Sequence, residues 1–198
     1  MAAYNNIFKI KHNNLLPDKG NILISEPFLQ DAYFQRAVVL LVEHNINGSM
    51  GFVLNKKTNL LINDFFSDLE NLSDIPIYLG GPVSPNRLFF IHTLDEKIIP
   101  DSIKIADGLY FDGDFDMLKQ YIIDGNPIKE KIKFFLGYSG WTKGQLGYEI
   151  KGNSWMVSHS PNTNIMLADD ESFWRHSMEV LGKKYKAWVN FPKDPLMN

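Results

Sequence analysis

The chain has 198 residues, of which 44% are hydrophobic and 22% are charged, as is usual for a soluble globular protein. Its 20 basic and 23 acidic residues give a formal net charge of −3, which weighs against general DNA binding because duplex binders need many phosphate contacts. Cysteine is absent, which excludes a disulfide framework, a thiolate nucleophile and a cysteine-based zinc site.

Nothing in the sequence indicates export or membrane insertion. The N-terminal residues 1–20 lack a basic region followed by an apolar core, so they do not form a secretory signal. The longest apolar run, 37–42, is far shorter than the roughly 20 residues that span a bilayer. We therefore expect a cytoplasmic protein that makes no membrane contact.

The first elements along the chain predict the centre of a sheet. Residues 21–25 form a short buried strand, and the continuously apolar segment 37–43 fits a strand that is covered on both faces. Residues 45–48, Asn-Ile-Asn-Gly, indicate a hairpin turn into a return strand at 50–54. A short polar connection, 26–36, separates the first two strands.

The middle of the chain mixes short strands with two helices. We expect a loop at 56–60 and then a short helix that begins at Asn63 or Asp64. The dipeptide Asp107-Gly108 favours a small hairpin. Asp114 caps an amphipathic helix at 115–123. The strands predicted in this part are 76–79, 88–93, 104–106 and 109–111.

The last part of the chain predicts two more strands and two more helices. The strands are 131–138 and 154–159, and between them Thr142 and Gln145 match a capping box for a helix that runs to about Lys151. Residues 164–167 read as an extended segment. Asp169 or Asp170 caps a final helix at 171–181.

These elements favour an α+β fold. Hairpins come early and the helices follow no regular βαβ period, so we expect a single domain with a mixed, mostly antiparallel β-sheet flanked by three to four helices. We assign residues 15–188 to this domain, residues 1–14 to an N-terminal lead-in segment, and residues 189–198 to a flexible C-terminal tail.

Three motifs, in this order and spacing, resemble those of the bacterial YqgE/AlgH family over roughly residues 15–185. The second is Tyr-Leu-Gly-Gly-Pro-Val at 78–83, and the third is Leu-Gly-Tyr-Ser-Gly-Trp at 136–141 followed by positions in 144–155. The first is carried by Gly20, Leu23, Ile24, Pro27, Leu29, Asp31, Phe34, Arg36, Val38, Val39, His44, Asn45, Gly48, Gly51 and Asn55.

The resemblance implies an α+β fold and a cytoplasmic bacterial protein. The family carries a label as a transcriptional regulator, but the resemblance supplies no reaction and no catalytic residue. It therefore places no catalytic role on any position of this chain.

Three polar residues of the first motif are the main candidates for binding. Arg36 could serve as an anion handle, with His44 and Asn55 beside it in a pocket at the 31–44 connection. The alternative is structural: Asp31 caps a helical turn, and Arg36 braces the connection by bonding to backbone carbonyls or to Glu26. We favour bracing over a pocket.

Weaker candidates come from the second and third motifs. Gly80 and Gly81 follow a strand and could present backbone N–H groups to an anion, although a tight turn explains them better. Ser139 lacks the second glycine of a nucleophile elbow, because Trp141 stands there and packs at the helix entry. The strand-end residues His44, His92 and His159 have no metal-ligand spacing.

Taken together, the sequence predicts a protein that acts by binding rather than by catalysis, with no cofactor and no metal site. The binding residues we assign are Arg36, His44, Asn55, Gly80, Gly81 and Trp141. The partner would be a protein or a small molecule, and a role in transcriptional regulation would follow the family label. The alternative is a small-molecule-binding protein or enzyme with its pocket near the Asp31–His44 connection.

Overall fold

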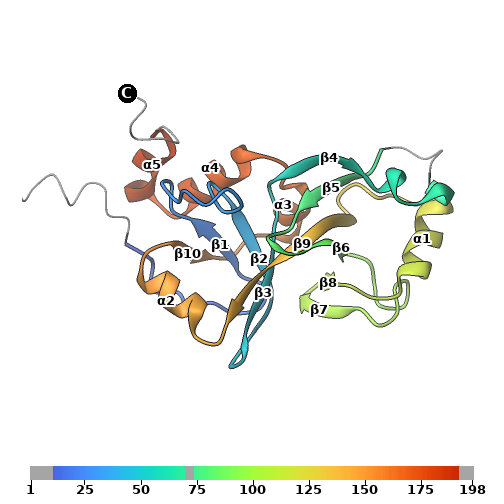
Figure 1. The fold of residues 1–198 in the computed structure, drawn as a ribbon, viewed down its shortest axis with the longest axis horizontal. Coiled ribbons are helices and arrows are strands. Elements are labelled where there is room, and N and C mark those ends of the chain that lie inside the picture. Colours follow the sequence, from blue (N-terminus) through green and yellow to red (C-terminus); the bar gives the residue numbers. More distant parts are fainter. Residues whose placement is uncertain (1–10, 70–73, 192–198) are drawn as a thin grey trace, which may run out of the picture.

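A ten-stranded sheet forms the body of the molecule, as the computed structural model shows for residues 11–69 and 74–191 (Figure 1). Two of the ten strands lie beside the main path: β5 (Pro76–Leu79) pairs in parallel with β9 (Ile132–Thr142), and β4 (Lys57–Leu61) pairs antiparallel with β5. Along the main path the strand order is β10 (Trp155–Ser158), β1 (Ile22–Ser25), β2 (Val38–Asn45), β3 (Gly48–Val53), β9 (Ile132–Thr142), β6 (Val83–His92), β8 (Leu109–Phe111) and β7 (Ile103–Ala106).

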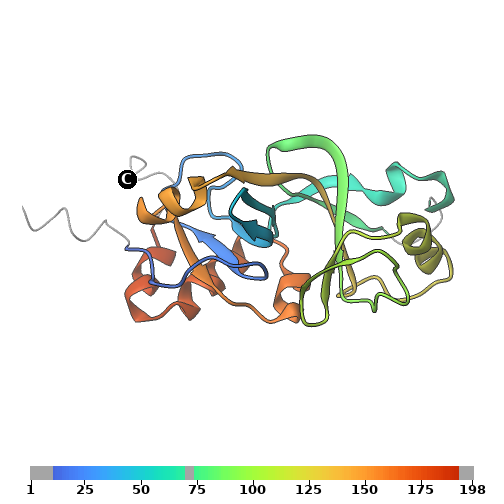
Figure 2. The same ribbon diagram turned by 90° about the horizontal axis from the view of Figure 1, so that it is seen from below.

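Within the described residues, five α-helices and two 3₁₀ turns accompany the sheet. Seen from either of two directions, α1 lies at one end of the molecule and α2, α4 and α5 lie at the other (Figures 1 and 2). In the part of the chain that the structure describes, no helix is both long enough and apolar enough to cross a membrane. The helices are α1 (Phe115–Ile123), α2 (Gln145–Lys151), α3 (Asn162–Leu167), α4 (Glu171–Val180) and α5 (Lys183–Val189), and the 3₁₀ turns are Ile62–Asp64 and Ser67–Leu69.

Strand β9 joins the two halves of the sheet. Its last residues pair with β3, where Ser139 lies opposite Gly51. Its first residues lie between β5 and β6, where Phe134 pairs with both Ile77 and Phe90. A single long strand therefore belongs to both halves, and side chains near its start and near its end face different surroundings.

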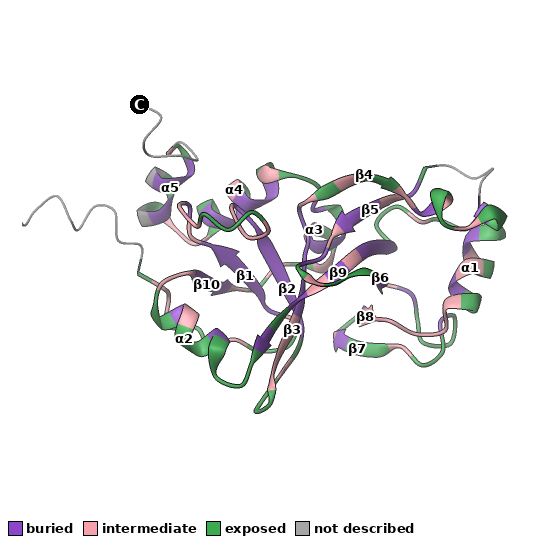
Figure 3. Ribbon diagram, viewed as in Figure 1, coloured by how far each residue is buried: buried purple, intermediate pink, exposed green. Residues whose placement is uncertain are grey.

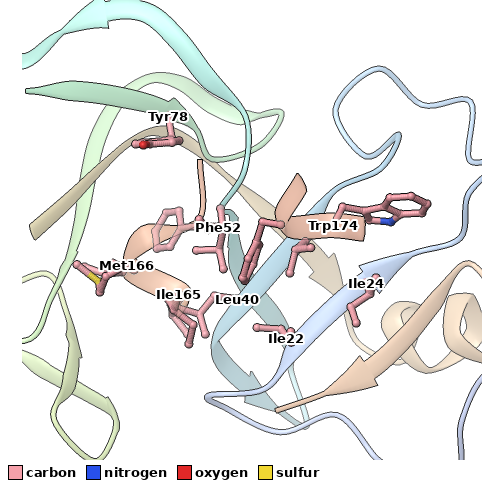
Figure 4. Close-up of a cluster of buried hydrophobic side chains, with 14 of the residues drawn as sticks. Ile22, Ile24, Leu40, Phe52, Tyr78, Ile165, Met166 and Trp174 are labelled. Carbon is pink, nitrogen blue, oxygen red and sulfur yellow. The ribbon is translucent and has the colours of Figure 1, made fainter. Parts of the chain in front are cut away.

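Three apolar clusters form the core, and burial is densest along the central strands (Figure 3). The largest packs α3 and α4 against the sheet and includes Leu40, Phe52 and Trp174 (Figure 4). The second lies under α1, and the third lies under α2 around Trp141 and Trp155. Successive residues of β9 point to opposite faces of the sheet and pack in different clusters, since Phe134 belongs to the second cluster and Phe135 to the first.

The α+β class and the mixed, mostly antiparallel sheet are confirmed. The predicted caps of two helices also occur, since the Asp114 side chain accepts from Met117 N–H and the Asp170 side chain accepts from Ser172 N–H. Thr142 belongs to β9, and α2 begins after Gly144. The predicted capping box is therefore wrong, although the Thr142 N–H and the Thr142 hydroxyl both donate to the Gln145 side-chain oxygen, at 3.0 Å and 3.1 Å.

Three predicted segments were wrong. The short helix expected from Asn63 or Asp64 is instead two 3₁₀ turns, Ile62–Asp64 and Ser67–Leu69. Residues 56–60 were expected to form a loop, but β4 occupies most of them because the polar chain pairs at the outer edge of β5. Residues 164–167 were expected to be extended, but they belong to α3, a short helix whose Ile165 and Met166 side chains are buried. Helix α5 was not predicted. Of the predicted lead-in and tail, residues 1–10 and 192–198 lie outside the described residues.

Candidate functional site

Arg36 holds three distant parts of the chain together. Its guanidinium pairs with the Glu171 carboxylate at the start of α4 and donates to the Phe191 carbonyl. The same group lies 5.2 Å from the centre of the Trp174 ring. Arg36 is 4% exposed and has a φ of 51°, so both its backbone and its side chain are fixed by the fold. This is a bracing role, in which the expected bond to a backbone carbonyl occurs and the acidic partner is Glu171 rather than Glu26.

Asn55 is a buried cross-link at the end of β3. Its side-chain oxygen accepts from Val38 N–H at 2.9 Å. Its side-chain nitrogen donates to the Arg36 carbonyl at 3.0 Å and to the Asp170 carbonyl at 3.1 Å. The amide thereby satisfies three backbone groups at the point where β2 begins and α4 starts.

Replacing Asn55 with alanine should therefore reduce the free energy of unfolding by about 2 to 3 kcal/mol, because three backbone groups lose their partner in a buried site. Urea denaturation monitored by circular dichroism measures this change. The control is Asn126→Ala, which removes one exposed bond to the Tyr121 carbonyl and should change stability much less. Equal losses in the two variants would contradict the cross-linking role.

His44 lies apart from Arg36 and Asn55. Its Nδ1 is 2.7 Å from the Ser49 hydroxyl across the β2–β3 hairpin. Arg36 and Asn55 contact the other end of β2, and His44 lies six residues further along the strand than Val38, which corresponds to roughly 20 Å. The structure thus brings Arg36 and Asn55 together and leaves His44 outside. A shared pocket at the Asp31–His44 connection does not form from these three residues.

Gly80 and Gly81 allow β5 and β9 to approach unusually closely. A Cβ atom on Gly80 would lie 2.2 Å from the Gly137 carbonyl oxygen. Gly81 has a φ of 152°, and a Cβ atom there would lie 2.4 Å from the Tyr138 carbonyl. Ser139, which is fully buried, donates from its hydroxyl to the Gly80 carbonyl at 3.0 Å. These positions have clear packing reasons, while anion binding at them stays a prediction.

Trp141 is anchored by a carboxylate on α2. Its indole N–H donates to Glu149 at 2.9 Å, and the indole of Trp155 donates to the same oxygen at 2.8 Å. The other Glu149 oxygen accepts from Gln145 at 3.0 Å. Glu149 therefore fixes α2 over the third cluster through both tryptophans, which are largely buried.

The histidines each have separate neighbours. His92 is fully buried beside Ser102 Oγ at 3.0 Å, and burial lowers the pKa of its imidazole. His159 Nδ1 lies 3.0 Å from the Asn21 side-chain nitrogen. Across residues 11–69 and 74–191, no cluster of three His, Asp or Glu side chains is arranged to hold a metal ion.

A different part of the fold contains the most distinctive cavity. It has a volume of about 470 Å³ and lies where β4, β5 and the start of β9 meet the connection between α3 and α4. Apolar walls come from residues such as Ile75, Ile128 and Met166. Figure 4 shows that Tyr78 and Met166 both lie on the side of the first cluster that is away from Trp174. This size and mixture of surfaces are typical of a small-molecule site.

Lys133 is the unusual member of this wall. The residue is only 3% exposed, and its Nζ donates to the Ala168 carbonyl. The same nitrogen lies 3.6 Å from the centre of the Tyr78 ring. Burial lowers the pKa of the Lys133 ammonium to about 7, against the opposing attraction of Asp169, and the nearby Lys57 charge lowers it further. A lysine this deep is costly to fold, and strongly shifted groups of this kind gather at functional sites.

Tyr78 and Asp169 complete the polar side of the cavity. The Tyr78 hydroxyl donates to Asp169 Oδ1 at 2.6 Å, and Lys57 Nζ lies 3.8 Å from the same oxygen. Burial and the Asp169 carboxylate raise the pKa of the Tyr78 hydroxyl, which keeps it protonated at neutral pH. A bound molecule would therefore meet an amine, a hydroxyl donor and a carboxylate on one wall.

The sequence reasoning did not find this site. Lys133 interrupts an otherwise apolar strand, Ile-Lys-Phe-Phe-Leu, and this was the available signal. Because alternate residues of a strand share a face, Lys133 lies on the same side as the fully buried Phe135. Asp169 was considered only as a helix cap, a role that Asp170 performs instead.

Comparisons with known proteins identify the family. A family profile described as AlgH-like matches residues 22–186. A UPF0301 protein from Parabacteroides distasonis is 65% identical over the full length of both chains, and one from Cytophaga hutchinsonii is 43% identical over 91% of this chain and 98% of its own.

Solved structures agree with this assignment. The solution structure of the AlgH protein from Pseudomonas aeruginosa is similar with a TM-score of 0.68 and 27% identity, covering 91% of this chain and 98% of that one. A crystal structure of a Corynebacterium diphtheriae protein shares the fold with a TM-score of 0.76 at 19% identity, covering 96% of this chain and all of that one. The chain belongs to the AlgH-like family.

Proposed function

We propose that this protein acts by binding a small organic molecule in the cavity beside Lys133. The observation that carries the proposal is a nearly inaccessible lysine placed on the wall of a 470 Å³ cavity. A buried cation that served only to anchor the α3–α4 connection would be replaceable by an apolar side chain, often with a gain in stability. Its position beside open space favours a ligand.

The cavity lining indicates the class of ligand. Apolar side chains from β5, from the segment that precedes β9 and from α3 would surround the apolar part of a ligand. Lys57, Lys129 and Lys133 stand against an equal number of carboxylates, Asp74, Glu130 and Asp169, so the charges of the wall are balanced. The best fit is a molecule with one polar head, directed at Lys133 and Tyr78, rather than a multiply charged anion.

The protein would then be a binding protein located in the cytoplasm, as the sequence predicts. A regulatory role, which the family label suggests, would consist in reporting the presence of the ligand to another molecule. Direct contact with DNA is not required for such a role, in keeping with the net charge of −3.

A fragment screen by methyl NMR tests this proposal. Fragments that bind should shift the methyl signals of Ile75, Ile128 and Met166, which line the cavity. The signals of Leu146 and Ile150, in the separate cluster under α2, should stay in place. Fragments that instead shift only signals of the third cluster, or a diverse library that shifts none of the cavity methyls, would refute the proposal.

A further inference from the structure

Lys133 has the position of a reacting group as well as that of a binding group. Its nitrogen is held at two points, by the Ala168 carbonyl and over the Tyr78 ring. A neutral amine that donates one N–H to a carbonyl keeps its lone pair free for another partner. Because Lys133 is part of the cavity wall, a molecule in the cavity would lie next to this side chain.

The protonation state of Lys133 favours nucleophilic attack. With a pKa of about 7, roughly half of the Lys133 side chains are neutral at neutral pH. An ordinary lysine, with a pKa near 10.4, is neutral in only about one molecule in 2,500 at pH 7. Desolvation in an apolar pocket is a general way in which proteins activate a lysine amine toward carbonyl compounds.

We propose that Lys133 captures an aldehyde or ketone as a reversible imine, a proposal that rests on the cavity being the binding site proposed above. The carbonyl compound would carry an apolar body, which the walls at Ile75, Ile128 and Met166 accept. Its carbonyl group would be the polar head that meets Lys133.

The chemistry balances without a further reactant. The Lys133 nitrogen adds to the carbonyl carbon, and a proton moves from nitrogen to the former carbonyl oxygen to give a carbinolamine. The carbon–oxygen bond then breaks, water leaves, and the carbon–nitrogen double bond forms. No electrons are exchanged, and the return of water releases the ligand.

Tyr78 and Asp169 are placed to position the bound carbonyl compound. The Tyr78 hydroxyl donates to Asp169 Oδ1 at 2.6 Å and belongs to the ring over which Lys133 lies. Elimination of water from a carbinolamine needs a second proton on the departing oxygen, and the remaining N–H of the Lys133 nitrogen supplies it. Tyr78 and Asp169 would therefore orient the ligand, while Lys133 forms the bond.

Benzaldehyde with sodium cyanoborohydride tests the proposal, because the reductant converts an imine into a stable benzyl amine. Brief treatment of the intact protein at pH 7, followed by peptide mass analysis, should find one benzyl group on Lys133. Labelling there should be at least about tenfold faster than at Lys104, an exposed lysine paired with Asp107. Lys133→Met should abolish this label, and Lys104→Met should leave it unchanged.

The pH profile of the wild-type protein gives a measurement that does not depend on any variant folding. The labelling rate at Lys133 should level off above about pH 7, where the amine is already neutral. The rate at Lys104 should continue to rise through pH 9, because its pKa lies above the ordinary value. Parallel profiles at the two lysines would overturn the assignment of Lys133 as an activated amine.

A non-reacting analogue separates this inference from the proposed function. Benzyl alcohol has the same apolar body and cannot form an imine, and its binding is read from the cavity methyl signals. Benzyl alcohol binding in the cavity without benzaldehyde labelling of Lys133 would overturn the imine and leave the binding function standing. Failure of both would count against both, and labelling spread evenly over exposed lysines would overturn the imine.

Discussion

Replacing Gly80 with alanine should abolish the folded state or reduce its free energy of unfolding by more than about 4 kcal/mol, a loss confined to a few severe mechanisms. The new Cβ atom would lie 2.2 Å from the Gly137 carbonyl oxygen and 3.0 Å from the Phe52 ring. The backbone at Gly80 cannot move away from this contact, because the Gly80 N–H donates to the Leu136 carbonyl at 2.8 Å and the Gly80 carbonyl accepts from the Val53 N–H at 2.9 Å. Thermal and urea denaturation of the purified variant measure the effect.

The matched control is Gly147→Ala, within helix α2. No atom lies within 4 Å of a Cβ placed on Gly147, and alanine is favoured over glycine in a helix by up to about 1 kcal/mol. This variant should be slightly more stable than the wild type. If Gly80→Ala proved as stable as Gly147→Ala, the close approach of β5 and β9 would be incorrect.

Replacing Lys133 with methionine should make stability less dependent on pH. The folded protein binds a proton at Lys133 with a pKa of about 7, whereas in the unfolded chain the value returns to about 10.5. Between these two values the unfolded state holds more protons, so this group makes the wild type more stable as pH rises. Below about pH 7 the full destabilisation by the buried charge is present, and above about pH 10.5 it has disappeared.

The variant carries no such charge, so its advantage over the wild type should be greatest near pH 6 and should shrink by on the order of 4 kcal/mol by pH 10. Losses of the Ala168 and Tyr78 contacts lower the stability of the variant at both pH values and do not cancel this trend. Urea titrations at pH 6 and pH 10 measure it. Lys104→Met is the control. Asp107 raises the pKa of Lys104, so the stability difference between this variant and the wild type should not shrink between pH 6 and pH 10 in the same way. If the difference in stability between Lys133→Met and the wild type were the same at pH 6 and pH 10, Lys133 would not be buried as a charge.

Local chemistry determined the parts of the fold that could be predicted. The continuous apolar run at 37–42 made β2 evident, and Asp114 and Asp170 capped helices as their side chains indicated. β4 escaped prediction because its pairing with β5 is supported by backbone bonds and by Thr58, whose hydroxyl donates to the Ile77 carbonyl, and not by an apolar pattern. α3 escaped because six residues are too few for a clear helical period.

The candidate cavity could not be predicted for a different reason. A lysine within a strand usually faces water, and nothing near Lys133 in sequence shows otherwise. Its burial is produced by Ala168 and Asp169, which the α3–α4 connection brings over it from a distant part of the chain. By contrast, the structural interpretation of Arg36 could be made from the sequence, and the contacts that Arg36 makes with Glu171 and Asn55 makes with Asp170 come from a distant part of the chain.

The central position of β9 also has a consequence for synthesis on the ribosome. The β2–β3 hairpin is complete once Val53 has emerged, yet β3 pairs with residues 139–142 and β1 pairs with β10 still later in the chain. At roughly 5 to 20 residues per second, the early strands wait on the order of 10 s with open edges. Those edges, apolar and rich in unpaired backbone groups, are where a nascent chain is most exposed to misassembly. Because β9 joins the two halves of the sheet, the half that contains β1, β2 and β3 cannot be completed until β9 and β10 have been synthesised.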